Sequence, residues 1–320
     1  MPPNPSPFPP PDFDLTHAYP DLAALRGAVV ARDWPSISAF FDRLPDADRR
    51  NVAVRTAAEV DGADQWFAEL VAANPDSSLI RVLYAASLIE AGWAVRSSYS
   101  AKYVSREQFK VFHDYLRRSE QLLIDITARE PDNVLAWALR QITALGLELG
   151  QAEARRRYDH VARYAPHCFF AQSRMLQQLC PKWSGDFDKA YAFARECAEA
   201  APDGAINAAL VADYYLERWL DFGDKAEAAA FLRRPEVQQE IRRAGGRSVL
   251  HPAHERGYKW YWAHNLFAAL FSLAGDYAAA AVHFRAVGPY GDRFVWGYLG
   301  EPTRNFVEHR DRALGTGVTR

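Results

Sequence analysis

The middle of the sequence contains three proline triplets, Glu130-Pro131-Asp132, Ala165-Pro166-His167 and Ala201-Pro202-Asp203, at intervals of 35 and 36 residues. Each proline ends a helix, because it lacks a backbone N–H and its ring clashes with the preceding turn. A regular interval of this length indicates a repeat of two stacked helices. The stretch from Ser105 to Pro202 therefore predicts an all-α fold, an α-solenoid of antiparallel helix pairs.

Between the prolines, apolar residues recur at the spacing of one helix face. Many of them are alanines, which let neighbouring helix axes approach closely. The pattern therefore predicts tightly stacked helices. One such stripe consists of Ala154, Tyr158, Val161 and Ala165, and the next consists of Phe187, Ala190, Tyr191, Ala194 and Ala198.

Two segments share a glycine followed by an aromatic residue at +2 and an alanine at +5, namely 185–190 (Gly-Asp-Phe-Asp-Lys-Ala) and 275–280 (Gly-Asp-Tyr-Ala-Ala-Ala). This spacing resembles the second helix of a tetratricopeptide repeat. The first helices lack the Trp-Leu-Gly-Tyr pattern of that family. The resemblance implies a tetratricopeptide-like array of helix pairs.

A wider set of residues carries a second resemblance. It comprises Gly92-Trp93, Arg96, Phe112-His113, Pro131-Asp132, Trp137-Ala138-Leu139 and the run from Leu179 to Gly185. Together these residues resemble an uncharacterised bacterial family, the domain of unknown function numbered four thousand and thirty-four. The resemblance extends from about residue 20 to residue 312, and it implies no activity, cofactor or catalytic residue.

With 320 residues, the chain is long for one compact core but ordinary for a repeat array, in which each unit packs only on its neighbours. We therefore expect a single helical-repeat domain over residues 20–314. Met1 to Pro11 contains seven prolines and can form neither a helix nor a central strand. Residues 1–19 are expected to be a disordered proline-rich tail, and residues 315–320 a second disordered tail.

The charges of the chain are balanced, with 38 Lys and Arg against 40 Asp and Glu. A net charge of −2 provides no general attraction for nucleic acid or an anionic membrane. The sequence has no signal-peptide pattern and no run of apolar residues long enough to span a membrane. Cys168, Cys180 and Cys197 form no C-x-x-C pair and are typical of buried residues in a reducing compartment. We expect a cytoplasmic protein with neither a nucleic-acid nor a membrane partner.

One repeat is longer than the others, because Pro75 precedes Pro131 by 56 residues. A helix from about Ser78 is expected to end at Ala91-Gly92. Ser105 and Gln108 form a capping box, which predicts that the next helix runs from Arg106 to about Arg129. The segment from Trp93 to Val104 is then a long loop within a repeat, and loops of that length are often functional.

The C-terminal third adds two predictions about helices. The segment from Pro235 to Ala244 is expected to be a short helix that Gly245-Gly246 ends. The pair Arg242-Arg243, like other arginine runs in this sequence, is interpreted as solvated helix surface. A terminal helix from about Pro302 to Leu314, polar on much of its surface, is expected to cap the array.

Catalytic motifs are missing from the sequence, which contains no G-x-S-x-G elbow, P-loop or G-x-G-x-x-G stretch. The nearest approach to a metal cluster is His251-Pro252-Ala253-His254-Glu255, with His264 and His283 nearby. Its spacing is not that of H-E-x-x-H, and Pro252 prevents a regular helix there. We therefore expect no metal, no cofactor and no catalytic residue. An enzyme remains an open but less favoured alternative.

If the helices stack as in tetratricopeptide arrays, several polar residues would line the concave side and could bind a peptide. They lie opposite the apolar stripes of their helices and are predicted to be outside the core. They are Trp137, Arg140 and Gln141 on one helix, and Arg174 and Gln177 on the next.

A second candidate site lies at the turns within the helix pairs, which share one edge of a stack. There the loop from Trp93 to Val104 is expected to cover the neighbouring turn and frame a small basic and aromatic pocket. Such a pocket could bind a carboxylate. An alternative is that the loop only plugs a packing gap. The residues involved are Trp93, Arg96, Tyr99, Lys102, Lys182 and Trp183.

These patterns favour a non-catalytic binding or scaffold protein that recognises a peptide or protein partner through a helical-repeat groove. Two alternatives remain open. One is an enzyme or small-molecule binder that uses the pocket under the 93–104 loop. The other is a purely structural module without a ligand.

Overall fold

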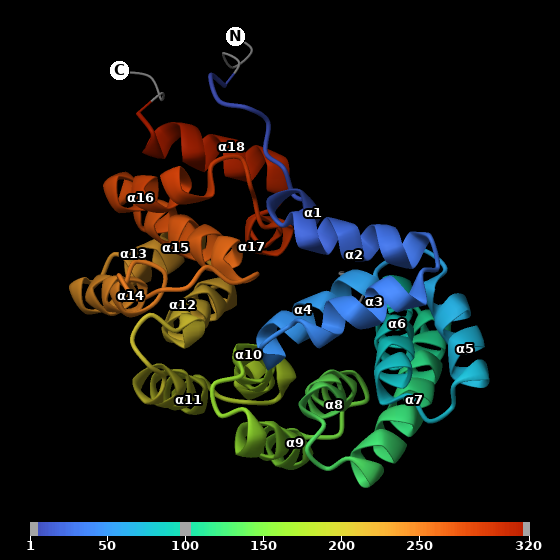
Figure 1. The fold of residues 1–320 in the computed structure, drawn as a ribbon. Coiled ribbons are helices and arrows are strands. Elements are labelled where there is room, and N and C mark those ends of the chain that lie inside the picture. The colour runs from blue at the N-terminus through green and yellow to red at the C-terminus, as the bar shows by residue number, and fades with distance from the viewer. Residues whose placement is uncertain (1–5, 97–103, 316–320) are drawn as a thin grey trace. The chain divides into compact units, whose positions relative to one another are not determined.

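The computed structural model describes residues 6–96 and 104–315, which are built almost entirely from helices and turns (Figure 1). Within these residues there is no β-strand, only an isolated parallel bridge between Asp12 and Tyr290. The predicted all-α class is therefore confirmed.

The contacts of the chain divide it into two compact units, where the sequence predicts one domain over residues 20–314. One unit combines Met1–Tyr19 with Asp186–Arg320, and the other is Pro20–Gly185. The division falls in the turn that contains the first glycine of the repeat-like pattern. Gly185 has no room for a side chain, because an added Cβ would lie 1.9 Å from the backbone oxygen of Leu179.

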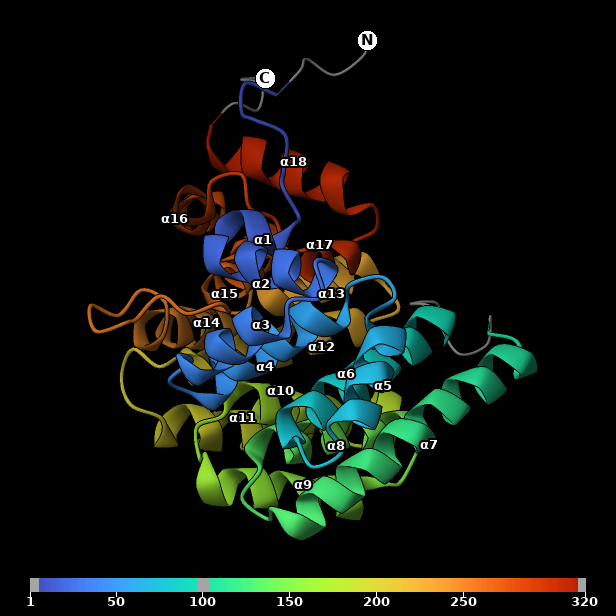
Figure 2. The ribbon, with the colours of Figure 1, turned by 45° about the vertical axis from the view of Figure 1, so that its right-hand side comes forward.

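In the unit Pro20–Gly185, successive helices pack against each other in pairs. α6 lies along α7 and α8 along α9, and two views show α6 and α7 side by side (Figures 1 and 2). The helices are α2 (Pro20–Val30), α3 (Trp34–Asp42), α4 (Ala47–Ala58), α5 (Ala63–Ala73), α6 (Ser78–Arg96), α7 (Arg106–Arg129), α8 (Val134–Gly146), α9 (Gln151–Tyr164), α10 (Phe169–Leu179) and the short 3-10 helix η2 (Pro181–Trp183).

Local capping chemistry accounts for the starts of several helices. Asp33 and Asp46 accept backbone hydrogen bonds at the starts of α3 and α4. Ser105 and Gln108 form the predicted capping box at the start of α7. These side chains satisfy backbone N–H groups that have no partner within the helix.

The end of α6 differs from the prediction. The helix continues through Gly92 to Arg96, so Trp93 lies on a helix rather than in a loop. A Cβ at Gly92 would lie 3.1 Å from the Cβ of Tyr115 and 3.4 Å from the ring of Phe112. This glycine therefore allows close packing against α7 instead of ending the helix.

The helix α4 is a core helix of its unit. It contacts α6, α8 and α10, which form a row, while α7 and α9 each bridge two neighbours in that row. Seven of the eight residues from Asn51 to Ala58 are buried, and only Arg55 is exposed. A helix that is buried on nearly all sides belongs to the core. The row formed by α6, α8 and α10 is thus covered by a helix of the same chain.

In the other unit, α12 and α15 are largely buried and carry most of the core. The helices are α1 (Leu15–Ala18), α11 (Phe187–Ala200), the 3-10 helix η3 (Ile206–Ala208), α12 (Ala209–Asp221), α13 (Lys225–Leu232), α14 (Pro235–Arg247), α15 (Trp260–Ala274), α16 (Tyr277–Val287), α17 (Arg293–Gly297) and α18 (Pro302–Ala313).

The helix α14 passes through both glycines that were predicted to end it and continues to Arg247. Gly245 is buried in the packing of α14 on its neighbours, whereas Gly246 is exposed. The expected helix stop at Ala244 is therefore wrong, because these glycines keep helical geometry in this position.

The described part of the predicted N-terminal tail packs against α18. The buried guanidinium of Arg310 donates to the backbone oxygen of Pro9 at 2.8 Å and to the hydroxyl of Ser6 at 2.8 Å. The ring of Phe8 lies 5.0 Å from the same guanidinium. Phe13 packs edge-on against Phe306, with 6.2 Å between ring centres. Residues 6–13 therefore differ from the expected tail without contacts.

Within the described ranges, α6 is the one helix long and apolar enough to cross a membrane. Of its most apolar stretch, 56% is buried in the protein. It packs against α4, α5, α7 and α8, so much of its surface lies in the core of its unit.

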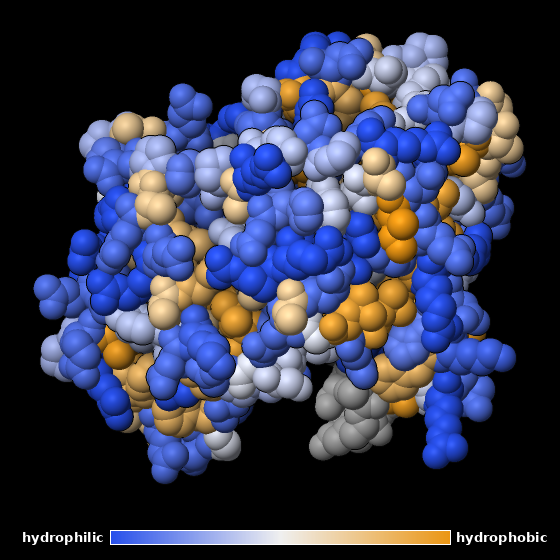
Figure 3. All heavy atoms as spheres, turned by 90° about the horizontal axis from the view of Figure 1, so that it is seen from below, coloured by the Kyte–Doolittle hydropathy of each residue, from blue (hydrophilic) through white to orange (hydrophobic). Residues whose placement is uncertain are grey.

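Hydrophilic side chains predominate on the face shown in Figure 3, with hydrophobic ones in small separate groups. Over the described residues, the exposed large hydrophobic side chains are likewise spread along the chain. Scattered exposed residues of this kind are normal and indicate no extended apolar surface. They are Val30, Val111, Ile124, Leu149, Tyr164, Leu250, Val282, Phe294 and Tyr298.

Candidate functional site

The three predicted binding residues of α8 are buried. Trp137 is 5% exposed, Arg140 7% and Gln141 4%. The amide of Gln141 donates to the backbone oxygen of Ala171 at 3.3 Å and so links α8 to α10. The prediction that these side chains lie outside the core is wrong, because each of them has partners within the unit.

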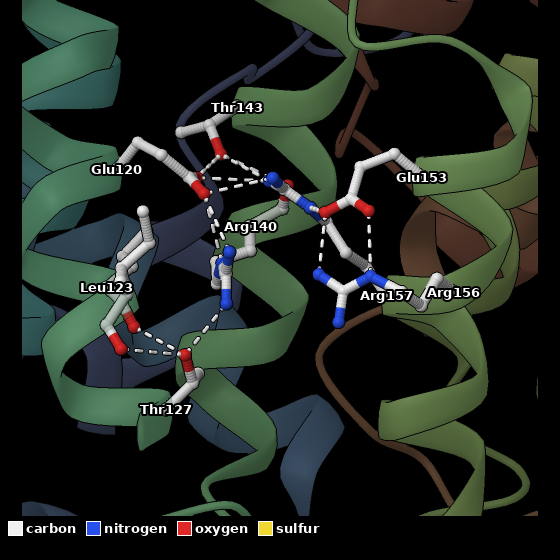
Figure 4. Close-up of polar contacts among 9 residues, drawn as sticks. Glu120, Leu123, Thr127, Arg140, Thr143, Glu153, Arg156 and Arg157 are labelled. Atoms are coloured by element: carbon white, nitrogen blue, oxygen red, sulfur yellow. Dashed lines mark hydrogen bonds and ion pairs between the residues drawn. The ribbon is translucent and has the colours of Figure 1, made fainter. Parts of the chain in front are cut away.

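Arg140 belongs to a buried ionic cluster that joins α7, α8 and α9 (Figure 4). The carboxylate of Glu120 accepts hydrogen bonds from Arg140 at 2.9 and 3.1 Å. It also accepts from Arg157 at 2.9 and 3.0 Å, and from the hydroxyl of Thr143. One carboxylate thus neutralises two guanidinium groups from different helices.

A second acidic residue completes the cluster. Glu153 accepts hydrogen bonds from Arg156 and Arg157 at 2.7 Å, and these bonds, those of Arg156 first, lower the pKa of Glu153 to about 2. Arg140 also donates to Thr127 at 2.8 Å. Burial lowers the pKa of Arg140 despite its acidic partner. Because the guanidinium donors of Arg140 and Arg157 are used within the protein, the cluster holds helices together rather than binding a ligand.

The indole ring of Trp137 is covered by side chains of the same unit. The ring of His160 lies parallel to it with 4.0 Å between ring centres. The guanidinium groups of Arg140 and Arg156 lie 4.7 and 5.5 Å from the indole ring. Burial lowers the pKa of His160, and the positive charges of the nearby arginines lower it further. The predicted aromatic contact for a peptide is therefore an internal one.

Arg174 and Gln177 of α10 are half-buried, in the helix row that α4 covers. At the start of α10, Asp48 of α4 accepts hydrogen bonds from the backbone N–H groups of Phe169 and Phe170 at 2.9 Å each. Burial raises the pKa of Asp48. The inner face predicted to hold a peptide thus already holds a helix of the same chain.

The second predicted site is only partly described. Trp93 packs edge-on against Phe112 at 4.8 Å, and Arg96 lies 5.2 Å from the Trp93 ring. Lys182 and Trp183 lie in η2, next to Ser184, whose backbone oxygen accepts a hydrogen bond from Gln151. Tyr99 and Lys102 lie outside the described residues. The pocket under the loop therefore stays a prediction.

The histidines nearest to a metal-ligand pattern have other partners. His254 bonds to the backbone oxygen of Gly204 at 2.7 Å. His264 and His283 face each other with their Nδ1 atoms 2.9 Å apart. Across residues 6–96 and 104–315, no three His, Cys, Asp or Glu side chains are placed to hold a metal ion.

A hollow of about 50 Å³ lies between α11 and α14, which both pack on α12. Its apolar surface comes from small side chains such as Ala198, Ala208 and Val211. On α14, residues 240, 243, 244 and 247 all line it, because this spacing puts them on one helix face. The hollow therefore has an apolar floor and charged walls.

Three arginines and two glutamates form the charged walls. Arg195 pairs with Glu199 at 2.7 Å, and this pair lowers the pKa of Glu199. Arg247 pairs with Asp203 at 3.0 Å. Arg243 is exposed, and its positive charge lies close enough to Glu199 to lower the pKa of that carboxyl, although no ion pair joins the two side chains among the described residues.

The carboxylate of Glu240 is held in place by two tyrosines. The hydroxyls of Tyr191 and Tyr215 donate to it at 2.5 and 2.6 Å. Burial, together with the carboxylate, raises the pKa of both tyrosines. These bonds fix Glu240 against the helices beneath it, and Glu199 is bonded to Arg195, so the guanidinium of Arg243 keeps hydrogen-bond donors for a further acidic group.

Sequence reasoning missed this hollow. The pair Arg242-Arg243 matches solvated helix surface by its sequence pattern, and no motif distinguishes Arg195. The spacing of the charged residues on α14 was a visible signal, but the apolar floor comes from η3 and α12 and depends on tertiary packing.

Neither a protein-family model nor a curated protein sequence matches this chain.

Proposed function

We propose that the protein is a non-catalytic scaffold that binds an acidic segment of a protein partner in the hollow between α11 and α14. We also infer that its helix pairs form a tetratricopeptide-like solenoid, which is supported by the row α6, α8, α10 with α7 and α9 packed on it. In such arrays, function depends on exposed helix faces rather than on a catalytic cleft.

The observation that supports this proposal best is the exposed guanidinium of Arg243 beside an apolar floor, where its acidic neighbour Glu199 is already bonded to Arg195. An arginine can bind a carboxylate through two parallel hydrogen bonds. The hollow of about 50 Å³ is far smaller than the roughly 300–1,000 Å³ of most small-molecule sites. A side chain or chain end of a protein fits it better than a metabolite does.

Affinity purification of the full-length chain, followed by cross-linking mass spectrometry, tests this function. We expect cross-links to α11 and α14, and at least a tenfold loss of the partner with Arg243→Glu, since about 1.4 kcal/mol corresponds to tenfold. Arg285→Glu is the matched control, because Arg285 is also exposed and lies in the same unit. A partner that Arg243→Glu retains in full, or that cross-links elsewhere, would contradict the proposal.

A further inference from the structure

A second hollow, of about 150 Å³, lies on the other side of α14. Its floor is formed by Phe271 of α15 and His283 of α16, and its mouth by Leu250 and Val282. Gly245 and Gly246 form the wall on α14. A cavity of about this volume accommodates a benzene-sized group.

Gly246 borders this hollow and is exposed. A Cβ at this position would meet nothing within 4 Å, so packing in the fold does not require a glycine there. A glycine within a helix is less favourable than an alanine. The helix thus leaves room beside it at the expense of its own stability.

Two of the exposed hydrophobic side chains of the described chain meet at this hollow. Leu250 is 46% exposed and Val282 is 45% exposed, and both line it. Apolar surface removed from water stabilises a complex in proportion to its area. An apolar group of a partner that covers Leu250 and Val282 would therefore stabilise the complex.

The floor is apolar and uncharged. Phe271 is 3% exposed and stacks on His283 with 5.7 Å between ring centres. The Nδ1 atom of His283 lies 2.9 Å from that of His264, so one neutral imidazole donates to the other. Such a floor suits an aliphatic or aromatic side chain.

Two arginines lie near the mouth, and one of them, Arg242, is neutralised by an ion pair. Arg242 lines the hollow, lies 5.1 Å from the Phe271 ring and pairs with Asp276. Arg243, on the neighbouring face of α14, is available for another acidic group. A ligand with carboxylates beside an apolar group therefore matches both the charge and the shape.

We infer that this hollow is an anchor pocket for one leucine, methionine or phenylalanine side chain of an acidic segment in a protein partner. The inference rests on the proposed function and adds to it the residue that the partner inserts. Large apolar anchors that fill pockets provide most of the affinity in many interfaces.

Two labelled peptides test this inference with the full-length protein. Both are acidic, and they differ only in a central residue, which is leucine in one and alanine in the other. We expect fluorescence anisotropy to show roughly tenfold tighter binding of the leucine peptide, from the burial of its larger side chain. Titration with this peptide should also shift the methyl NMR signals of Leu250 and Val282.

Gly246→Leu places a large side chain at the wall of the pocket and should abolish the preference for the leucine peptide. Its thermal stability should be unchanged or higher, because the added side chain meets open space and leucine favours a helix. Gly27→Leu on α2 is the matched control, since a Cβ at Gly27 also meets nothing within 4 Å. Val282→Asp provides a second blocking variant at an exposed site.

The outcomes distinguish the anchor pocket from the proposed function. Equal binding of both peptides, or an unchanged leucine preference in Gly246→Leu and Val282→Asp, overturns the anchor pocket. If Arg243→Glu still weakens both peptides in that case, the proposed function stands without the pocket. If neither peptide binds the wild-type protein, both proposals are overturned.

Discussion

The side chain of Asp48 caps a helix that begins 121 residues further along the chain, with its carboxylate on the backbone N–H of Phe169. The residue at the N-cap position of α10 is Cys168, whose side chain makes no capping hydrogen bond. A carboxylate at this place also interacts favourably with the positive end of the helix dipole. Asp48 thus replaces a local cap and ties α4 to α10.

Removing this cap should destabilise the unit that contains α4. We expect Asp48→Ala to lower the free energy of unfolding by about 1 to 3 kcal/mol, because two backbone N–H groups lose a charged acceptor. Chemical denaturation measures this change. Asp76→Ala is the control, since the side chain of Asp76 is 94% exposed. Equal stability of the two variants would show that the cap has no energetic role.

The buried ionic cluster should tolerate complete replacement better than partial removal. We expect Arg157→Met to cost about 3 to 5 kcal/mol, because the carboxylate of Glu120 then keeps only part of its neutralisation. Replacing Glu120, Arg140 and Arg157 together by leucine or methionine should cost less, since no buried charge remains. Denaturant unfolding of both variants decides this. A triple variant less stable than Arg157→Met would contradict the expectation.

The histidine pair should make stability depend on pH. Burial lowers the pKa of His264 to about 4 and that of His283 to about 3, from an ordinary value of 6.5. Between pH 6.5 and about 3, the unfolded chain therefore binds more protons than the folded protein. Stability from this pair is complete above pH 6.5 and decreases as the pH falls through this window.

At pH 4.5 we expect a loss on the order of 2 to 5 kcal/mol relative to pH 7 from this pair. Thermal unfolding across the pH range measures it. A variant with leucine at both positions should lose this part of the pH dependence. An identical pH profile in that variant would assign the effect to other groups.

The N-terminal segment should contribute to stability, although its sequence predicts a tail without contacts. Deleting residues 1–11 removes both hydrogen-bond acceptors that Ser6 and Pro9 provide for the buried Arg310. We expect a loss of about 1 to 3 kcal/mol, detectable as a lower melting temperature. In an Arg310→Ala background the same deletion should have a smaller effect. An unchanged melting temperature after deletion in the wild type would contradict the observed contacts.

Helix starts were predictable because their signals are local. The capping box of Ser105 and Gln108 and the caps at Asp33 and Asp46 each involve residues within one turn of the helix start. The burial of Arg140 was not predictable in this way. Its partner Glu120 precedes it by 20 residues on another helix, and neutralisation by that partner allows an arginine into the core.

Glycines are a second case in which local sequence signals do not predict the structure. Gly92 and Gly246 both matched helix-stop signals, yet both lie inside helices. At Gly92 the reason is close packing on α7, and at Gly246 it is open space beside α14. Sequence alone does not distinguish these two uses, because both depend on what a neighbouring helix places there. The same holds for the candidate site, whose walls come from α11 and α14.

The position of α4 has a consequence for how the unit folds during synthesis. The ribosome makes α4 before α10. The contacts between the two helices require more than a hundred further residues, because Asp48 and Phe169 are separated by 121 residues. Contacts between distant parts of a chain slow folding. In a simple repeat array, each repeat contacts only its neighbours and can fold or unfold in turn. Here α4 connects the first part of the unit to the last, so its helices should complete folding together, after translation has passed α10.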